Sequence, residues 1–188
     1  MNTPLRIASL GLIVVAWAWL SSPVSALPPA DKDAAKADPA DAIKPPDGLV
    51  VLAKLKAEGV QIYDCKVIDP NQRALRYQWV LKAPAAELKD DGGKKVGKHG
   101  DGPTWEDDDG KVIGARPPVG TLQKDGTIPW LLLKADKTEG KGTFAKVTYI
   151  QRVDTTGGAA PKQVDESYAG TELRVPYKAT YVFYGPKQ

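Results

Sequence analysis

The sequence predicts an all-β fold, an antiparallel β-sandwich or closed barrel of about seven to nine strands. Apolar and polar residues alternate along several short segments, which is the period of a strand with one buried face. Glycine and proline, 18 and 16 of the 188 residues, separate these segments. No long segment has the periodicity of an amphipathic helix, and no unit repeats at a fixed spacing.

The first strand is expected at residues 49–55, a short apolar stretch that also fits a helical turn. A second strand is expected after Gly59, at residues 60–67, where the turn-forming residues 69–71 end it. Residues 75–81 place Leu, Tyr, Trp and Leu at every second position, which predicts a strand with these four side chains buried.

Three further segments complete the predicted set of strands. Residues 128–133 form a continuous apolar run, and residues 144–153 and 173–184 are rich in β-forming side chains. In the last segment every odd-numbered residue from 173 to 183 is apolar or aromatic, so these residues are expected to face the core.

Two polar segments are expected to form turns. Residues 89–98 are predicted to be a solvated turn rather than a binding patch. The pair Asp109-Gly110 predicts a hairpin turn between strands at 104–106 and 111–113. The acidic run before Gly110 lacks the alternate spacing of calcium ligands and the distal Glu of an EF-hand, so we expect no metal site there.

The N-terminal residues 1–26 have the pattern of an export signal. Arg6 precedes an apolar run that is too short to span a bilayer, and residues 24–26 provide the small residues that a signal peptidase requires. Residues 27–42, rich in Pro, Ala and Asp, are expected to be a flexible spacer. A single β domain should follow at residues 43–188, in a protein that is exported to the periplasm or outside the cell, without a membrane anchor once the signal is removed.

Composition restricts the function classes. The chain has 26 Lys and Arg against 23 Asp and Glu, and the basic residues are scattered, so we expect no nucleic-acid partner. With Cys65 as the one cysteine and His99 as the one histidine, a disulfide within the chain and the common zinc sites are excluded. We expect no metal and no cofactor. Ser167 lies outside any G-x-S-x-G motif, so a serine triad is not indicated.

The segment 97–106 is the first candidate site, because it contains His99, Trp105 and Glu106 among several glycines. As a binding loop it would present a partly exposed Trp105 ring to a sugar or an aromatic group. As a structural loop it would bury Trp105 in the end of the fold, with His99 bonded to a buried backbone carbonyl. The sequence favours the structural interpretation for His99.

Two residues of later strands are further candidates. Trp130 lies in the apolar run 128–133, where a tryptophan more often packs in the core than contacts a ligand. Arg152 interrupts an otherwise apolar strand, where it would either pair with Glu106 or Asp101 or hold a ligand. The candidate ligand-binding residues are therefore His99, Trp105, Glu106, Trp130 and Arg152, and no catalytic residue is assigned.

Several of these segments together resemble a known family of exported proteins, the domain of unknown function 3455. The segments 59–65, 97–106, 128–134 and 149–158 occur in that order in the family, and residues 174–177 with 181–184 match its closing strand. The resemblance implies no activity that could be transferred. It does imply a second cysteine after the Gly-Gly-x-Ala-Pro stretch, and this chain has none there, so Cys65 is expected to be unpaired.

The preferred function is a non-catalytic binding module for a small molecule, a glycan or another envelope component. A hydrolase that uses carboxylates with His99 is the alternative from the enzyme class, and it requires a second Asp or Glu facing Glu106 across a cleft. A purely structural or interaction domain is the third possibility. Convergence of the candidate residues on one pocket would distinguish these alternatives.

Overall fold

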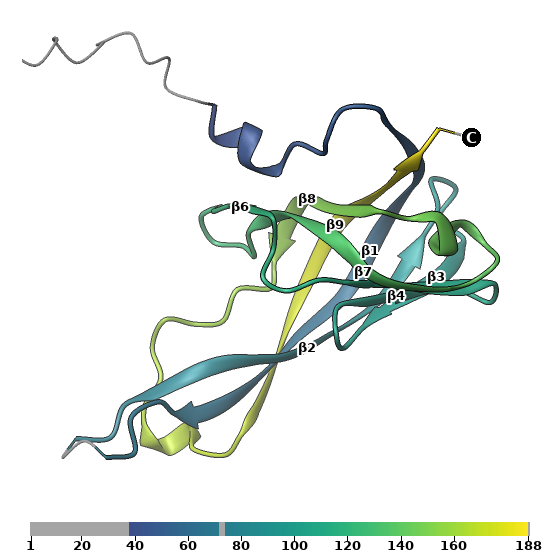
Figure 1. Ribbon diagram of the computed structural model, residues 1–188. Coiled ribbons are helices and arrows are strands. Elements are labelled where there is room, and N and C mark those ends of the chain that lie inside the picture. Colours follow the sequence, from purple (N-terminus) through teal and green to yellow (C-terminus); the bar gives the residue numbers. More distant parts are fainter. Residues whose placement is uncertain (1–37, 72–73, 188) are drawn as a thin grey trace, which may run out of the picture. The chain divides into compact units, whose positions relative to one another are not determined.

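The computed structural model describes residues 38–71 and 74–187, so the predicted signal at residues 1–26 lies outside the described residues. Within them the chain is all-β, as predicted, with one antiparallel sheet of nine strands and three short 3-10 helices (Figure 1). The strands are β1 (Leu49–Val67), β2 (Tyr77–Lys89), β3 (Lys95–Gly100), β4 (Thr104–Glu106), β5 (Gly110–Gly114), β6 (Gly120–Leu122), β7 (Trp130–Gly140), β8 (Tyr149–Gly157) and β9 (Glu172–Pro186). The 3-10 helices are η1 (Pro39–Ile43), η2 (Thr143–Lys146) and η3 (Glu166–Tyr168). None of the helices in this part of the chain is long and apolar enough to cross a membrane.

Eight of the nine strands form a closed ring. Their order is β5-β4-β3-β2-β1-β9-β8-β7, and β5 then pairs with β7 to close it. The remaining strand, β6, pairs with the first residues of β7, whereas β5 pairs with the later ones. Because each ring strand has a neighbour on both sides, the inward-facing residues of eight strands surround one interior.

The hydrophobic core occupies this interior. Its fully buried side chains come from different strands and include Leu88 of β2, Trp105 of β4, Val112 of β5, Ile150 of β8 and Phe183 of β9. In β9 the predicted inward residues Tyr177, Ala179, Tyr181 and Phe183 are all nearly fully buried. Thr180 and Val182 on the opposite face are buried as well, so the alternation is confirmed only in part.

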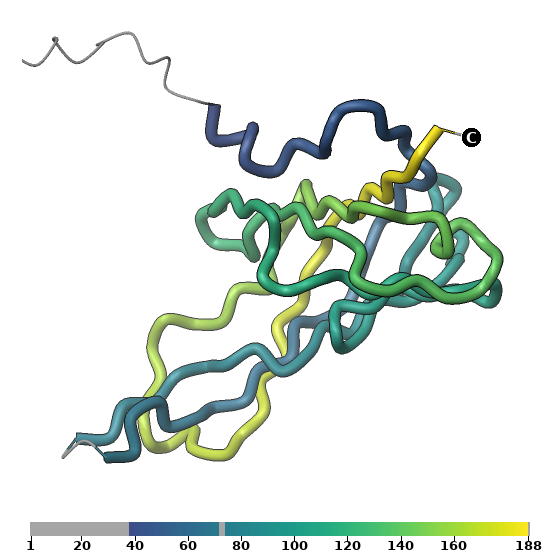
Figure 2. The backbone as a smooth tube through the Cα atoms, in the orientation of Figure 1, coloured from purple at the N-terminus to yellow at the C-terminus, as the bar shows by residue number. Residues whose placement is uncertain are grey.

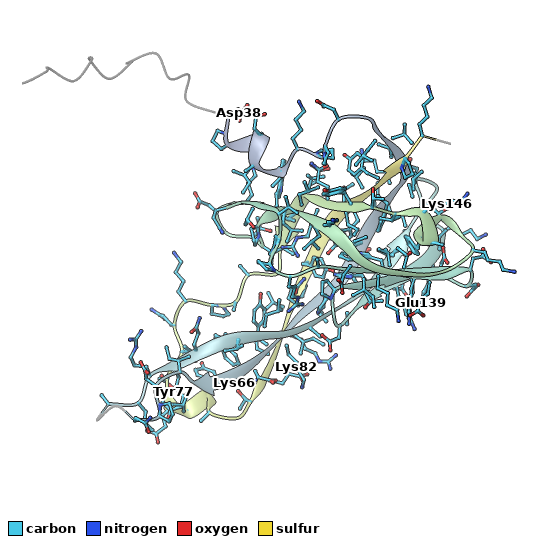
Figure 3. The ribbon with its side chains drawn as sticks, in the orientation of Figure 1. Asp38, Lys66, Tyr77, Lys82, Glu139 and Lys146 are labelled. Carbon is cyan, nitrogen blue, oxygen red and sulfur yellow. The ribbon has the colours of Figure 1, made fainter. Side chains whose placement is uncertain are left out.

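β1, β2 and β9 extend beyond the core of the ring as a three-stranded extension (Figure 1). It has its own cluster of buried side chains around Tyr63, Cys65 and Trp79. The segment between β8 and β9 runs along it to its far end (Figure 2). Lys66 and Tyr77 are labelled on this extension in Figure 3. The extension therefore has a small core separate from that of the ring.

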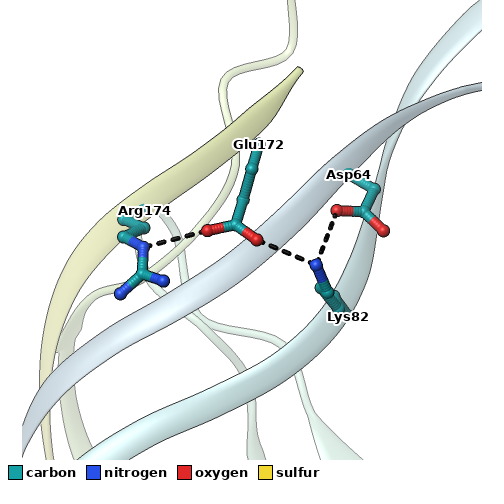
Figure 4. Close-up of polar contacts among 4 residues, drawn as sticks. All are labelled: Asp64, Lys82, Glu172 and Arg174. Carbon is teal, nitrogen blue, oxygen red and sulfur yellow. Dashed lines mark hydrogen bonds and ion pairs between the residues drawn. The ribbon is translucent and has the colours of Figure 1, made fainter. Parts of the chain in front are cut away.

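A chain of ion pairs crosses the three strands of the extension (Figure 4). Glu172 of β9 accepts hydrogen bonds from Arg174 Nε and from Lys82 Nζ of β2, both at 2.9 Å, and Lys82 also lies 3.5 Å from Asp64 of β1. The bonds from Lys82 and Arg174 lower the pKa of Glu172. All four side chains are exposed to solvent to a substantial degree, so the network contributes little to stability.

The strands predicted at 49–55 and 60–67 are a single strand, β1, with Gly59 in its middle. The separation predicted at this glycine is therefore wrong. A Cβ atom at residue 59 would lie 2.1 Å from the carbonyl oxygen of Ala85 on β2, and 2.7 Å from the Cβ of Ala86. Gly59 is thus required for the close approach of β1 and β2, and it does not end a strand.

The alternation predicted for 75–81 holds only in part. Trp79 is buried, but Leu81 is 44% exposed and Leu75 lies before β2 and is also exposed. A β-bulge follows directly after Leu81: Ile62 pairs with Ala83 and Tyr63 with Leu81, which leaves Lys82 as an extra residue in β2. After the bulge the inward face moves to the even-numbered residues of β2.

Other boundaries also differ from the predictions. The turn expected over 89–98 is limited to residues 90–94, because β2 continues to Lys89 and β3 begins at Lys95. The strand expected at 128–133 begins at Trp130 and continues to Gly140, and the segment 144–153 begins with η2 rather than with a strand. The Asp109-Gly110 hairpin turn is confirmed between β4 and β5, where Asp107 Oδ1 accepts both backbone N–H groups of that pair.

The last residues of the predicted spacer are part of η1, and the earlier ones lie outside the described residues. Pro39 stands at the start of this helix, where its missing N–H has no cost, and the side chain of Asp38 caps it. Ile43 at its end is buried, and its carbonyl accepts a hydrogen bond of 2.7 Å from Gln151 Nε2 of β8. This contact attaches the start of the domain to the ring.

Candidate functional site

A cavity of about 300 Å³ lies inside the ring. Seven of the eight ring strands contribute to its lining. Four lining residues that carry side-chain polar atoms are almost completely buried and form its floor: Gln61 of β1, His99 of β3, Trp105 of β4 and Tyr181 of β9. This volume is at the lower end of the range for small-molecule sites.

The rim of the cavity is exposed. Leu81, at the bulge of β2, and residues 116–118, in the connection between β5 and β6, line the cavity and are open to solvent. Pro84, Leu131 and Leu133 supply apolar wall between the rim and the floor. The cavity thus combines an apolar wall with a small number of polar groups, which is the usual composition of a ligand site.

His99 and Trp105 form the centre of the floor. They are directly opposite each other in the β3–β4 pair, so their side chains share one face of the sheet. The two rings are stacked, with centroids 4.4 Å apart and planes inclined by 7°. Tyr181 packs edge-on against both, at 5.0 Å from His99 and 5.2 Å from Trp105. The three rings form one aromatic surface, to which the β3–β4 hairpin contributes two rings and the distant strand β9 the third.

The imidazole of His99 is neutral. Burial lowers its pKa to about 3, and the positive charges of Arg152 and Arg116 contribute in the same direction. Nδ1 lies 2.9 Å from the carbonyl oxygen of Thr104, so in the neutral ring it carries the proton and donates. Nε2 is left as the acceptor. The buried carbonyl partner proposed for His99 from the sequence is therefore present.

Arg152 is held in place by the backbone. Its Nε and Nη2 both donate to the carbonyl oxygen of Pro129, at 3.0 and 2.8 Å. Its positive charge affects the ionisation of Tyr181 on the floor of the cavity. Burial raises the pKa of the Tyr181 hydroxyl, and Arg152 opposes this with a smaller effect that lowers it. Arg116 is the second guanidinium at the cavity. Among the described residues neither arginine forms an ion pair, although Asp136 lies with Arg116 at a neighbouring surface depression.

Two floor residues carry buried polar atoms without a hydrogen bond to the described part of the chain, namely Gln61 Nε2 and Trp105 Nε1. A third buried group, the Tyr181 hydroxyl, interacts with the side chains of Arg152 and Tyr177 and keeps its own proton to donate. Burial raises the pKa of Tyr181, so its hydroxyl stays protonated at neutral pH. Each of the three groups is therefore a potential donor, and unpaired buried donors are uncommon in folded proteins.

A family model described as "Protein of unknown function (DUF3455)" matches residues 45–185. The chain belongs to this family. The match begins ahead of β1 and ends at the penultimate residue of β9, so the cavity lies entirely within the DUF3455 domain. The resemblance read from the sequence is thereby confirmed. A search of curated proteins found no match, and neither did a search of solved structures.

The structure brings three of the five candidate residues of this DUF3455 domain to the cavity: His99, Trp105 and Arg152. The segment 97–106 is a β-hairpin rather than an irregular loop, and the partly exposed Trp105 of the binding-loop interpretation is wrong, because Trp105 is only 1% exposed. The ring nevertheless contributes to the floor from inside the fold.

The other two candidates lie elsewhere. Glu106 is on the outer surface, where its carboxylate pairs with Lys98 Nζ at 2.8 Å and raises the pKa of that lysine. Trp130 is half-buried, and Lys124 Nζ lies over its ring, 4.0 Å from the centroid. The ion pair suggested between Arg152 and Glu106 or Asp101 is wrong, since Arg152 binds the carbonyl of Pro129 instead.

The sequence interpretation did not select Gln61, Arg116 or Tyr181 of the DUF3455 domain. Tyr181 had a signal, because it is on the predicted inward face of 173–184. Gln61 is a polar residue between apolar ones, and its burial becomes visible only once Gly59 is placed inside β1. Arg116 has no local pattern and reaches the cavity through the β5–β6 connection.

The lining of the cavity contains no carboxylate. Across residues 38–71 and 74–187, no three His, Cys, Asp or Glu side chains gather into a group that could hold a metal ion. The groups present can donate hydrogen bonds, provide positive charge and pack against an apolar body. This inventory suits recognition of a ligand better than proton transfer.

Proposed function

We propose that this DUF3455 domain binds a small molecule in the ring cavity. The observation that carries the proposal is the composition of the cavity: apolar walls, a floor of three packed aromatic rings, and two arginines without an ion-pair partner in the described chain. Apolar cavities with a few convergent polar groups are the usual form of small-molecule sites.

The geometry favours binding over hydrolysis. The hydrolase alternative needs Glu106 and a second carboxylate facing each other beside His99. Glu106 lies outside the cavity and pairs with Lys98, and the neutral His99 donates through Nδ1 to a backbone carbonyl. Binding of a glycan on an open tryptophan surface is also less favoured, because Trp105 is buried and Lys124 lies over Trp130.

The proposal is tested by a thermal-shift screen of a small-molecule library on the folded domain, followed by titration of the hits. A ligand that binds only the folded state raises the melting temperature with its concentration. Leu81→Trp places a large side chain at the exposed rim and should abolish the shift while the protein stays folded. Leu75→Trp is the matched control, because Leu75 is also exposed and lies away from the cavity.

Saturable binding that Leu81→Trp removes and Leu75→Trp retains would support the proposal. If both variants still show the ligand-dependent rise in melting temperature, the ligand binds outside the ring cavity. If no compound of the library gives a saturable shift, the structural or interaction role becomes the better explanation.

We also infer that the domain acts outside the cytosol. The support is the pattern of residues 1–26, with a basic flank, a short apolar run and small residues at positions 24 and 26. The mature chain should begin at Leu27, within one residue. Intact-mass analysis of protein from the periplasm or medium of a bacterial host tests this inference, and exported protein that retains Met1 would contradict it.

A further inference from the structure

We infer that the ligand of the ring cavity is a small monocarboxylate with a compact apolar body, whose carboxylate is bound at Arg116 and Arg152. The inference rests on the proposed function and specifies the chemistry of the ligand. Three independent properties of the lining support it: its charge, its excess of donors and its apolar wall.

The charge of the lining is positive. Arg116 and Arg152 both line the cavity, and no Asp or Glu does. The positive charges of both arginines reach His99 on the floor of the cavity, since each contributes to the lowered pKa of its imidazole. Asp136, near Arg116 at the adjoining surface depression, forms no ion pair with it within the described part of the chain. An anion would therefore be favoured in this cavity.

The lining also has more donors than acceptors. Gln61 Nε2 and Trp105 Nε1 are buried without a partner in the described chain, and these two groups and the buried Tyr181 hydroxyl each carry at least one proton to donate. A carboxylate accepts hydrogen bonds only, through two oxygens, and it matches a guanidinium in a bidentate geometry. A neutral alcohol or amide would use fewer of the available donors.

The wall of the cavity is apolar and limits the size of the ligand. Pro84, Leu131 and Leu133 line it, and the stacked His99 and Trp105 rings provide a flat apolar surface. A volume of about 300 Å³ accommodates a body of one or two rings or a short alkyl chain. Inorganic phosphate or sulfate would leave this surface unused, so one carboxylate on an apolar body fits better than a compact polyanion.

The test compares acids with their neutral amides by calorimetric titration of the folded protein. Cinnamate and hexanoate represent aromatic and aliphatic bodies, with cinnamamide and hexanamide as their uncharged counterparts. The acids should bind at least about tenfold more tightly than the amides, since a hydrogen bond to a charged group contributes more than a neutral one. Sodium sulfate and phosphate at equal ionic strength should neither bind in the cavity nor compete.

Arg116→Gln should weaken binding of the acids by about tenfold and binding of the amides much less. Arg116 is exposed, so its replacement is not expected to disturb folding. Arg76→Gln is the matched control, because it removes the same charge from an exposed position outside the cavity and should change neither affinity.

The outcomes separate the inference from the proposed function. Equal binding of acids and amides, or competition by sulfate as strong as by cinnamate, would overturn the carboxylate inference while the binding function stands. The carboxylate inference would also be overturned if neither acid binds while library ligands of another chemistry do bind, and Leu81→Trp abolishes their binding. If nothing binds in the cavity, the proposed function fails as well.

Discussion

The His99 imidazole and the Trp105 indole lie parallel, with centroids 4.4 Å apart, at the centre of the ring. Both side chains are almost completely buried, and Tyr181 closes over them edge-on. The same pair therefore belongs to the hydrophobic core and to the floor of the cavity. Substitutions here are expected to change stability and binding together, so the two effects must be measured separately.

Trp105→Ala should lower the free energy of unfolding by about 3 to 5 kcal/mol, because it removes a large buried ring and leaves a cavity. Trp130→Ala is the control of the same residue type. Its ring is only half-buried, so its loss should cost less, about 1 to 2 kcal/mol. Urea denaturation followed by circular dichroism measures both values. A cost for Trp105→Ala no larger than that for Trp130→Ala would contradict the central position of Trp105 in the core.

His99 should make the stability depend on pH in acid. Its folded pKa of about 3 is below the ordinary value of 6.5, so the unfolded state binds the proton more readily. The stabilisation is complete above about pH 6.5 and is lost as the pH falls toward 3, up to about 5 kcal/mol in total. Urea denaturation at a series of pH values should show this slope for the wild type, and a smaller slope for His99→Gln.

The protonation state of His99 can be observed directly, since it is the one histidine of the chain. Its Cε1 proton resonance should not shift between pH 8 and about pH 4.5 while the protein is folded. A titration midpoint near 6.5 in the folded protein would show that the imidazole is solvated and would remove it from the floor of the cavity.

Gly59 should be far less tolerant of substitution than Gly100. In Gly59→Ala the new Cβ would lie 2.1 Å from the carbonyl oxygen of Ala85, so β1 and β2 would have to separate. Gly100, at the end of β3, has no heavy atom within 4 Å of a Cβ and does not have a positive φ. We expect Gly59→Ala to cost about 3 kcal/mol or more and so to lower the melting temperature by about 10 °C, and Gly100→Ala to leave it nearly unchanged. Equal melting temperatures for the two variants would contradict the close contact of the strands.

The sequence predicts the fold class and the inward face of β9 because both depend on local alternation. The odd-numbered residues of β9 from 173 to 183 are all apolar or aromatic, and β9 pairs with β1 along its length and with β8 from Tyr177 to Tyr184. The face of β2 could not be predicted in the same way. The bulge at Lys82 reverses its alternation, and it arises from the pairing of β2 with β1 and not from β2 alone.

Closure of the ring explains why the site was predicted only in part. Trp105 and Tyr181 become neighbours because β5 pairs with β7, and that pairing has no signature in either strand. Arg116 approaches the cavity through the connection that follows β5. Glu106 was selected for its proximity to His99 in the sequence, but alternation places it on the opposite face from Trp105.

Cys65 should behave as a slow thiol. Its side chain is 4% exposed and packs in the cluster of the extension, with Tyr63, Trp79 and Val164 in the same cluster. A thiol reagent therefore reaches the sulfur only when the extension opens. Labelling at neutral pH, followed by mass spectrometry, should be much slower for the native protein than in denaturant. Rapid labelling of the native protein would show that the cluster is open and would make Cys65 a candidate reactive group.

The replacement of Cys65 distinguishes packing from chemistry. Cys65→Val should keep the cluster filled and change the free energy of unfolding by less than about 2 kcal/mol. Cys65→Ser should cost more than Cys65→Val, because it buries a hydroxyl among apolar side chains. Neither variant should alter binding of a ligand in the ring, since Cys65 does not line that cavity. Loss of binding in Cys65→Val with unchanged stability would show that the extension takes part in recognition.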